Sequence, residues 1–253
     1  MNVDMILIGC GGTGGCFFSK MARFLADTTF QNMNVVFRIM DGDHVEPKNL
    51  GRQPFIEEDI GKNKAVALAS AAEEIMDLKV KAYPEYLRPE NQAVLNQRLF
   101  ERTSSEDIQI VIGAVDNHAC RKLLHEYFKG YSRYQTLFYI DAANEFSCGE
   151  IVIGKKVKSK TECPDRVHYY PDILSDTEKA PYEMSCEELN QAAPQHLATN
   201  SMAADLLFAY LTQILTAGDM ASKAPGGIIY FDTFKLFSRF VIYKEEKDEK
   251  IKS

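Results

Sequence analysis

The chain has no CxxC cysteine pair, no apolar run as long as a membrane span and no excess of positive charge. Structural zinc sites are often built from such cysteine pairs, so we expect no zinc. A membrane-spanning helix needs about 20 apolar residues, so we expect no association with a membrane. The formal net charge of −7 argues against general binding to nucleic acid or to an anionic surface.

The sequence also lacks internal repeats and low-complexity blocks, and its six cysteines show no regular spacing. Scattered cysteines suit a reducing compartment, and the first apolar run lies too close to Met1 for a signal peptide. We therefore expect a cytoplasmic protein. With 253 residues, of which 45% are hydrophobic, the chain can bury a sizeable core and is typical of a globular protein.

The first 41 residues carry the pattern of a nucleotide-binding unit. An apolar run at residues 5–8 is followed at once by the glycine-rich sequence GCGGTGG and then by a helix-compatible run to Ala26. Glycines at this place permit a tight turn and let backbone N–H groups approach a phosphate. A second apolar run ends at Asp41, where a carboxylate can accept the hydroxyls of a ribose. The whole order predicts nucleotide binding.

Apolar and helix-compatible runs continue to alternate over the first 140 residues. They predict strands at residues 80–83, 108–112 and 136–140 and helices at 65–76, 91–100 and 118–128. This alternation is typical of an α/β fold with a Rossmann-like, doubly wound, mostly parallel sheet. Ligands of such sheets bind at the carboxyl ends of strands, where Asp41 and Asp116 fall.

The C-terminal part has a different pattern within what we expect to be one domain, residues 1–253. Residues 1–145 form the nucleotide-binding half and 146–243 the C-terminal half, followed by a charged tail at 244–253. A strand at 149–154 has no helix before it, so we expect it to run antiparallel. Residues 155–185 are polar and without periodicity, and we expect a long connection there. A buried helix is predicted at 203–215 and a closing hairpin at 228–231 and 236–243.

Longer motifs resemble those of one known family. The likeness lies in the sequences GCGGTG at residues 9–14, DGDHVEPKNLGRQ at 41–53 and DIGKNKA at 59–65. They are similar to motifs of the ubiquitin-activating superfamily, which includes the ThiF-, MoeB- and HesA-type adenylyltransferases. Asp116, Asn117 and Arg121 resemble its later D-N-x-x-x-R element. Residues 139–149 look closest to the ThiF-like proteins of PRTRC plasmid systems.

The resemblance implies an ATP-dependent adenylyltransferase that activates the C-terminal carboxylate of a small ubiquitin-like or sulfur-carrier protein. In such chemistry the protein mainly positions phosphates and stabilises their charge. Asp41 would hold the ribose and Asp116 a magnesium ion. The predicted catalytic residues are Arg52, Lys64, Asp116 and Cys186. The predicted ATP-binding residues are Gly9, Gly11, Gly12, Gly14, Asp41, Asn49, Arg52, Gln53, Lys64 and Asn117.

Ordinary structural roles compete with several of these assignments. Lysines and arginines are usually solvated surface charges, and Lys62 is a neighbouring alternative to Lys64. Asp43 could orient its loop instead of contacting a ligand. Asp116 could be the N-cap of the helix that follows it.

Cys186 is the predicted reactive cysteine. It lies in a segment that resembles the cysteine-bearing segment of thioester-forming relatives, and a thiolate there would capture the activated acyl group. Neighbouring Glu187 and Glu188 disfavour the thiolate. We expect Cys10, Cys16, Cys120 and Cys148 to be packing residues and Cys163 to be exposed.

The resemblance also implies partners. We expect a β-grasp carrier, with a ubiquitin-conjugating-like protein as a further candidate, and a homodimer. In such dimers an arginine before the first strand reaches the partner's site, but residues 1–4 are not basic here, and we expect no such arginine. Arg23 is the nearest basic substitute for that arginine, and we place it on a helix surface.

Two other kinds of protein share parts of the pattern. A nicotinamide-dependent oxidoreductase also has a glycine turn and a strand-end acid, although hydride transfer needs no set like Arg52, Lys64 and Asp116. A catalytically silent relative would bind nucleotide or a partner only. A comparison of ATP and NAD binding distinguishes the adenylyltransferase from the oxidoreductase. Pyrophosphate exchange distinguishes the adenylyltransferase from the silent relative.

Overall fold

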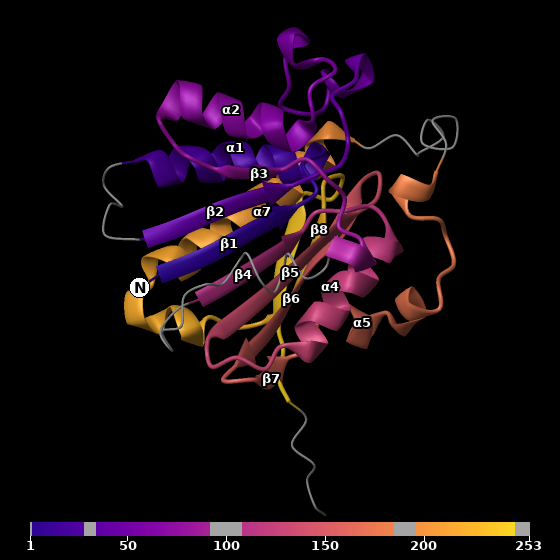
Figure 1. Ribbon diagram of the computed structural model, residues 1–253. Coiled ribbons are helices and arrows are strands. Elements are labelled where there is room, and N and C mark those ends of the chain that lie inside the picture. Colours follow the sequence, from indigo (N-terminus) through magenta and orange to yellow (C-terminus); the bar gives the residue numbers. More distant parts are fainter. Residues whose placement is uncertain (1, 28–33, 92–107, 185–195, 246–253) are drawn as a thin grey trace, which may run out of the picture.

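The computed structural model describes residues 2–27, 34–91, 108–184 and 196–245. Within them, one mixed nine-stranded sheet runs through the molecule, with α1, α2 and α7 on one face and α4 and α5 on the other (Figure 1). The strands are β1 (Asn2–Ile8), β2 (Asn34–Met40), β3 (Lys81–Tyr83), β4 (Ile108–Gly113), β5 (Thr136–Asn144), β6 (Cys148–Val157), β7 (Lys160–Cys163), β8 (Gly227–Asp232) and β9 (Phe237–Ile242). The helices are α1 (Gly12–Ala26), α2 (Lys64–Met76), α4 (His118–Gly130), α5 (Arg166–Tyr169) and α7 (Leu197–Thr216).

The strand order is β3-β2-β1-β4-β5-β6-β8-β9, and β7 pairs with β6. The first five strands in this order, β3, β2, β1, β4 and β5, are parallel to one another. The chain moves outward from β1 to β3 and then returns to the other side of β1 as β4. The boundary between β1 and β4 is therefore the topological switch point, where α/β sheets open a crevice at the carboxyl ends of their strands.

The C-terminal half adds antiparallel strands to the same sheet. Strand β6 pairs antiparallel with β5 and with β8, and β8 pairs antiparallel with β9. The predicted doubly wound sheet, its antiparallel extension and the closing hairpin are all confirmed.

The predicted long connection at residues 155–185 is wrong in its first part. Strand β6 continues to Val157, and β7 and α5 follow within the segment. The lysines of this segment make it look polar, so the strand could not be recognised from the sequence. Their aliphatic stems are buried on the strand, while their ammonium groups contact polar partners. Lys155 pairs with Glu162 at 2.8 Å, and Lys156 Nζ donates to the Lys129 carbonyl at 2.8 Å. The helix predicted at 91–100 lies almost wholly outside the described residues.

Each face of the sheet has its own apolar core. On one face, Phe17 and Met21 of α1 pack with Leu207, Leu211 and Ile214 of α7, all fully buried. Burial of each such side chain contributes about 1.5–3 kcal/mol. The predicted apolar helix is thus confirmed as the buried α7. On the other face, apolar residues of α4 cover β4 and β5.

Among the described helices, none is both long and apolar enough to cross a membrane.

Candidate functional site

The glycine turn joins β1 to α1 at the switch point. Gly9 has φ of +93°, and a Cβ there would overlap the carbonyl oxygen of Ala114 at the end of β4. A Cβ on Gly14 would overlap the Gly9 carbonyl oxygen. These two glycines therefore let the turn close and let α1 approach it. The helix begins at Gly12 without a side-chain cap, so its first N–H groups are suited to an anion.

Asp41 follows β2 and is held beside this turn by two backbone donors. The Cys10 N–H donates to Asp41 Oδ2 at 2.6 Å, and the Asp43 N–H donates to Oδ1 at 2.7 Å. Burial, together with the neighbouring Asp43 carboxylate, raises the pKa of Asp41 to about 6. A fixed, buried carboxylate at the end of β2 is the arrangement that binds ribose hydroxyls in this type of sheet.

Lys64 is the first residue of α2 and is almost fully buried. Asn63 caps that helix and also donates to the carbonyl oxygens of Asp41 and Asp43, at 2.8 and 3.0 Å. Lys64 Nζ lies 2.9 Å from Asp43 Oδ2. Burial opposes its positive charge, but the carboxylates of the site raise its pKa, so it remains an ammonium ion.

Lys62, the alternative to Lys64, points elsewhere. Its side chain is 53% exposed and pairs with Asp59 at 3.1 Å. The structure therefore brings Lys64, and not Lys62, to Asp41 and Asp43.

Asp116 follows β4 and is exposed. Its charge contributes to the raised pKa of Lys64, and Ala114, two residues before it, lies against Gly9 of the glycine turn. The alternative role of Asp116 as N-cap is wrong, because Asn117 caps α4: its Oδ1 accepts from the Cys120 N–H at 2.8 Å. Arg121 Nη2 donates to the Val115 carbonyl at 2.6 Å, and Arg121 Nε pairs with Asp141 Oδ1 at 3.3 Å, which fixes the loop carrying Asp116.

Asn49, Arg52 and Gln53 come from the loop between β2 and α2. Asn49 is buried and shapes this loop: its Oδ1 accepts from the Glu46 N–H at 2.9 Å, and its carbonyl accepts from the N–H groups of Arg52 and Gln53. Gln53 lies against Gly11, and its buried Oε1 has no hydrogen-bond partner among the described residues. Arg52 is half-buried and makes no ion pair with any residue that the structure describes. Gln53 therefore has an acceptor available beside the glycine turn.

The site fits a magnesium ion held mainly by a nucleotide. Among the described residues, no group of three histidine, cysteine or acidic side chains could hold a metal alone. Magnesium at nucleotide sites typically takes one or two carboxylates and completes its shell with phosphates and water. The exposed carboxylate of Asp116 suits that role.

Three side chains of the site region were not found from the sequence. Asn63 had a usable signal, because asparagine directly before a helix is a common N-cap. Tyr86 had none: it follows β3, and its hydroxyl donates to Asp43 Oδ1. Thr13 of the glycine turn had none either. It contacts Asn144 at 3.0 Å and thereby joins α1 to the end of β5.

The cysteine predictions have mixed outcomes. Cys186 lies outside the described residues. The expectation that Cys163 is exposed is wrong: it is 2% exposed, and burial raises its pKa to about 12. Such a thiol is a poor nucleophile. Cys10 and Cys120 are buried packing residues, as predicted.

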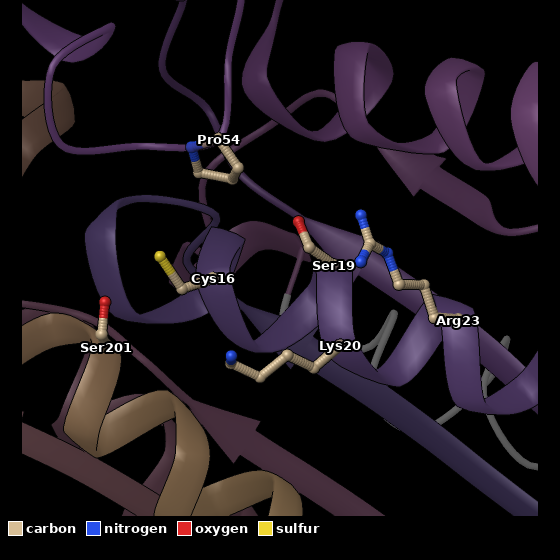
Figure 2. Close-up of a pocket in the computed structure, with 6 residues that line it drawn as sticks. All are labelled: Cys16, Ser19, Lys20, Arg23, Pro54 and Ser201. Atoms are coloured by element: carbon tan, nitrogen blue, oxygen red, sulfur yellow. The ribbon is translucent and has the colours of Figure 1, made fainter.

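A separate pocket of about 220 Å³ lies along α1, beside Pro54 and the first turns of α7 (Figure 2). Four of its residues are on one side of α1, including Lys20, which pairs with Asp205 at 2.9 Å. Arg23 is exposed on this helix, as predicted. The lining residues are Cys16, Ser19, Lys20, Arg23, Pro54 and Ser201. None of the predicted site residues lines this pocket.

Comparisons with known proteins give a family and a fold. The model of the ThiF family matches residues 1–249. The structure is similar to that of PaaA, with a TM-score of 0.62, 17% identity, and coverage of 94% of this chain and 64% of that one. It is also similar to MccB of E. coli in complex with MccA-N7isoASN, with a TM-score of 0.62, 20% identity, and coverage of 95% and 64%.

A structure of E. coli MccB with ATP is similar as well, with a TM-score of 0.59, 19% identity, and coverage of 95% of this chain and 63% of that one. The chain therefore spans just under two thirds of the length of these neighbours. At such identities the likeness concerns the fold alone. No protein of curated function matches the sequence.

Proposed function

Because the chain belongs to the ThiF family, we propose that it is an ATP-dependent adenylyltransferase. Its substrate would be the C-terminal carboxylate of a small ubiquitin-like or sulfur-carrier protein. The observation that carries the proposal is the set of charged groups around the glycine turn. Asp41 accepts from the Cys10 N–H, Lys64 pairs with Asp43, and Asp116 follows β4, whose end lies against Gly9. These groups suit ATP and its phosphates better than a nicotinamide.

The proposed reaction joins a carboxylate oxygen to the α-phosphorus of ATP and breaks the bond to pyrophosphate, giving an acyl-adenylate. Asp41 orients the ribose, and the N–H groups at the start of α1 bind phosphate oxygens. Lys64 and Arg52 stabilise negative charge as it develops, and Asp116 would hold the magnesium ion. The magnesium ion would supply charge neutralisation on the phosphates. Asn49, Gln53 and Asn117 keep their predicted binding roles as part of this proposal.

The carrier and any conjugating partner also belong to the proposal. The structure of the microcin C7 biosynthetic enzyme MccB in complex with N-formylated MccA is of the same fold, and it supports the proposal that this chain also binds a partner. We propose a β-grasp carrier for this chain, with a ubiquitin-conjugating-like protein as a further candidate partner. Neighbouring genes that encode both would support this placement.

The decisive experiment is carrier-dependent exchange of labelled pyrophosphate into ATP, alongside binding of ATP/Mg²⁺ and of NAD. The wild-type protein should bind ATP and catalyse exchange. Lys64→Ala should reduce exchange about 10²-fold or more, since it removes a group that contacts developing charge. Asp116→Ala should reduce exchange through loss of magnesium.

Lys62→Ala is the matched control, because Lys62 is exposed and pairs with Asp59. It should exchange at the wild-type rate. Equal rates for Lys64→Ala and Lys62→Ala in folded protein would refute the site. Binding of NAD but not ATP would refute the proposed reaction, and ATP binding without exchange would identify a silent relative.

A further inference from the structure

Tyr86 approaches the site from the turn after β3 and contacts Asp43 directly. Its hydroxyl donates to Asp43 Oδ1, while Lys64 Nζ lies 2.9 Å from Asp43 Oδ2. One carboxylate thus holds a phenol on one oxygen and an ammonium group on the other. The three side chains come from three separate loops or elements, so their meeting is a tertiary feature.

The position of the Tyr86 ring depends on Gly42. A Cβ at Gly42 would overlap three carbons of the ring, so any larger residue would displace it. The turn that carries the ring is also fixed, since Asn91 Nδ2 donates to the Tyr86 carbonyl at 2.8 Å. Tyr182 packs against the ring, with centroids 6.1 Å apart. The hydroxyl is therefore aimed at Asp43 by several independent contacts.

Asp43 needs such a partner to stay in one place. Its side chain is 41% exposed, whereas that of Lys64 is 8% exposed. Packing therefore restrains Lys64 far more than Asp43. Burial raises the pKa of Asp43, but Lys64 and the Tyr86 hydroxyl outweigh it and lower that pKa overall. The phenol thus favours the ionised carboxylate that Lys64 requires.

We infer that Tyr86 is a positioning residue for Lys64, which it acts on through Asp43. The inference deepens the proposed function and rests on it, because the ammonium group of Lys64 is the group that would meet the phosphates. Without the phenol, Asp43 gains rotational freedom and Lys64 loses its fixed counter-charge. A misplacement of about 1 Å in a charged group can reduce catalysis about 10²-fold.

The test compares Tyr86→Phe with Tyr134→Phe, which loses the hydroxyl of an exposed tyrosine. In pyrophosphate exchange, Tyr86→Phe should lower kcat about 10-fold or more and change KM for ATP less, while Tyr134→Phe should match the wild type. A second readout is acetylation of lysines by acetic anhydride, mapped by mass spectrometry. Tyr86→Phe should increase acetylation of Lys64 and leave exposed Lys62 unchanged.

Two further variants establish the route through Asp43. In an Asp43→Asn background, adding Tyr86→Phe should cause little further loss, because both changes break the same link. Gly42→Ala displaces the ring and should reproduce the Tyr86→Phe result, and their combination should again be non-additive.

Wild-type rates and wild-type acetylation of Lys64 in Tyr86→Phe would overturn the inference. Additive losses in the Asp43→Asn background would overturn the route through Asp43. If the wild-type protein shows no exchange, the proposed function fails, and the acetylation comparison still decides the role of Tyr86.

Discussion

Lys64 is almost fully buried, and a buried ammonium group keeps its proton only when opposite charge is close. The structure supplies that charge from Asp43 at 2.9 Å, and the carboxylates of Asp41 and Asp116 also raise the pKa of Lys64. Lys62 lies only two positions away but is solvated and paired on the surface. The difference between the two lysines is therefore one of environment. The charge and position of a lysine at this site therefore depend on whether the fold buries it beside a carboxylate.

Binding of a ribose at Asp41 should depend on pH. The pKa of Asp41 in the folded protein is raised to about 6, so the carboxylate gains a proton as pH falls through that value. A protonated carboxyl accepts ribose hydroxyls less well, so the affinity for adenosine should fall below about pH 6. Adenosine is used because, unlike ATP, it has no phosphates that titrate in this range. Its affinity can be measured by calorimetry.

Asp41→Asn should bind adenosine more weakly than the wild type and with no change between pH 5 and pH 7. A wild-type affinity that stays constant over this range would contradict the assignment of Asp41 to the ribose.

Cys186 should carry a thioester in the proposed cycle. Its thiolate would attack the acyl carbonyl of the adenylate, and AMP would leave. Enzyme, ATP, Mg²⁺ and carrier should then give a thiol-sensitive adduct on a non-reducing gel. Cys186→Ser should lose the adduct and retain pyrophosphate exchange. An adduct that survives this substitution would refute the assignment, and buried Cys163 is a poor replacement.

At the scale of elements, β1 and α1 form one unit with the end of β4. Gly9 places its Cα against Ala114, and Gly14 places α1 against Gly9. Neither position has room for a side chain, because helix, turn and neighbouring strand touch through their backbones. The glycine pattern therefore has a packing role in addition to the phosphate-binding role that we propose for it.

Gly14→Ala should destabilise the protein by about 2 kcal/mol or more, because the methyl group would overlap the Gly9 carbonyl. Gly51→Ala is the matched control, since a Cβ there meets no atom within 4 Å. Urea unfolding should separate the two variants clearly. Equal midpoints would show that α1 can move away from the turn at little cost.

At the scale of the whole molecule, one sheet connects the parallel half to the antiparallel half through β5 and β6. Arg166 of α5 pairs with Asp141 of β5 at 3.1 Å, and Arg121 of α4 pairs with the same carboxylate. Burial raises the pKa of Asp141, but the two arginines outweigh it and lower that pKa overall. The C-terminal half thus supports the loop that carries Asp116.

We predict that the protein is a homodimer in solution. Sedimentation at micromolar concentration should give twice the mass of one chain, 28.6 kDa. Arg23 is exposed on α1 and is the first arginine in the sequence. Arg23→Ala should leave pyrophosphate exchange unchanged if no partner's site uses it. A monomer at this concentration would contradict the prediction.

The sequence by itself determined the parallel half, the glycine turn and the order of the predicted site residues. Those features rest on local rules: apolar runs form strands, glycines permit turns, and strand ends of a doubly wound sheet meet at one edge. The antiparallel β6 and the β8–β9 hairpin were predictable for the same reason.

Only the tertiary structure decided which charged groups are desolvated and which partners they have. The burial of Lys64 beside Asp43, the burial of Cys163 and the contact of Tyr86 with Asp43 all depend on segments distant in sequence. The lysine-rich start of the segment at 155–163 was misread because its lysines are buried on a strand, where Lys155 pairs with Glu162 and Lys156 donates to the Lys129 carbonyl. Burial and pairing are properties of packed elements, so local periodicity could not supply them.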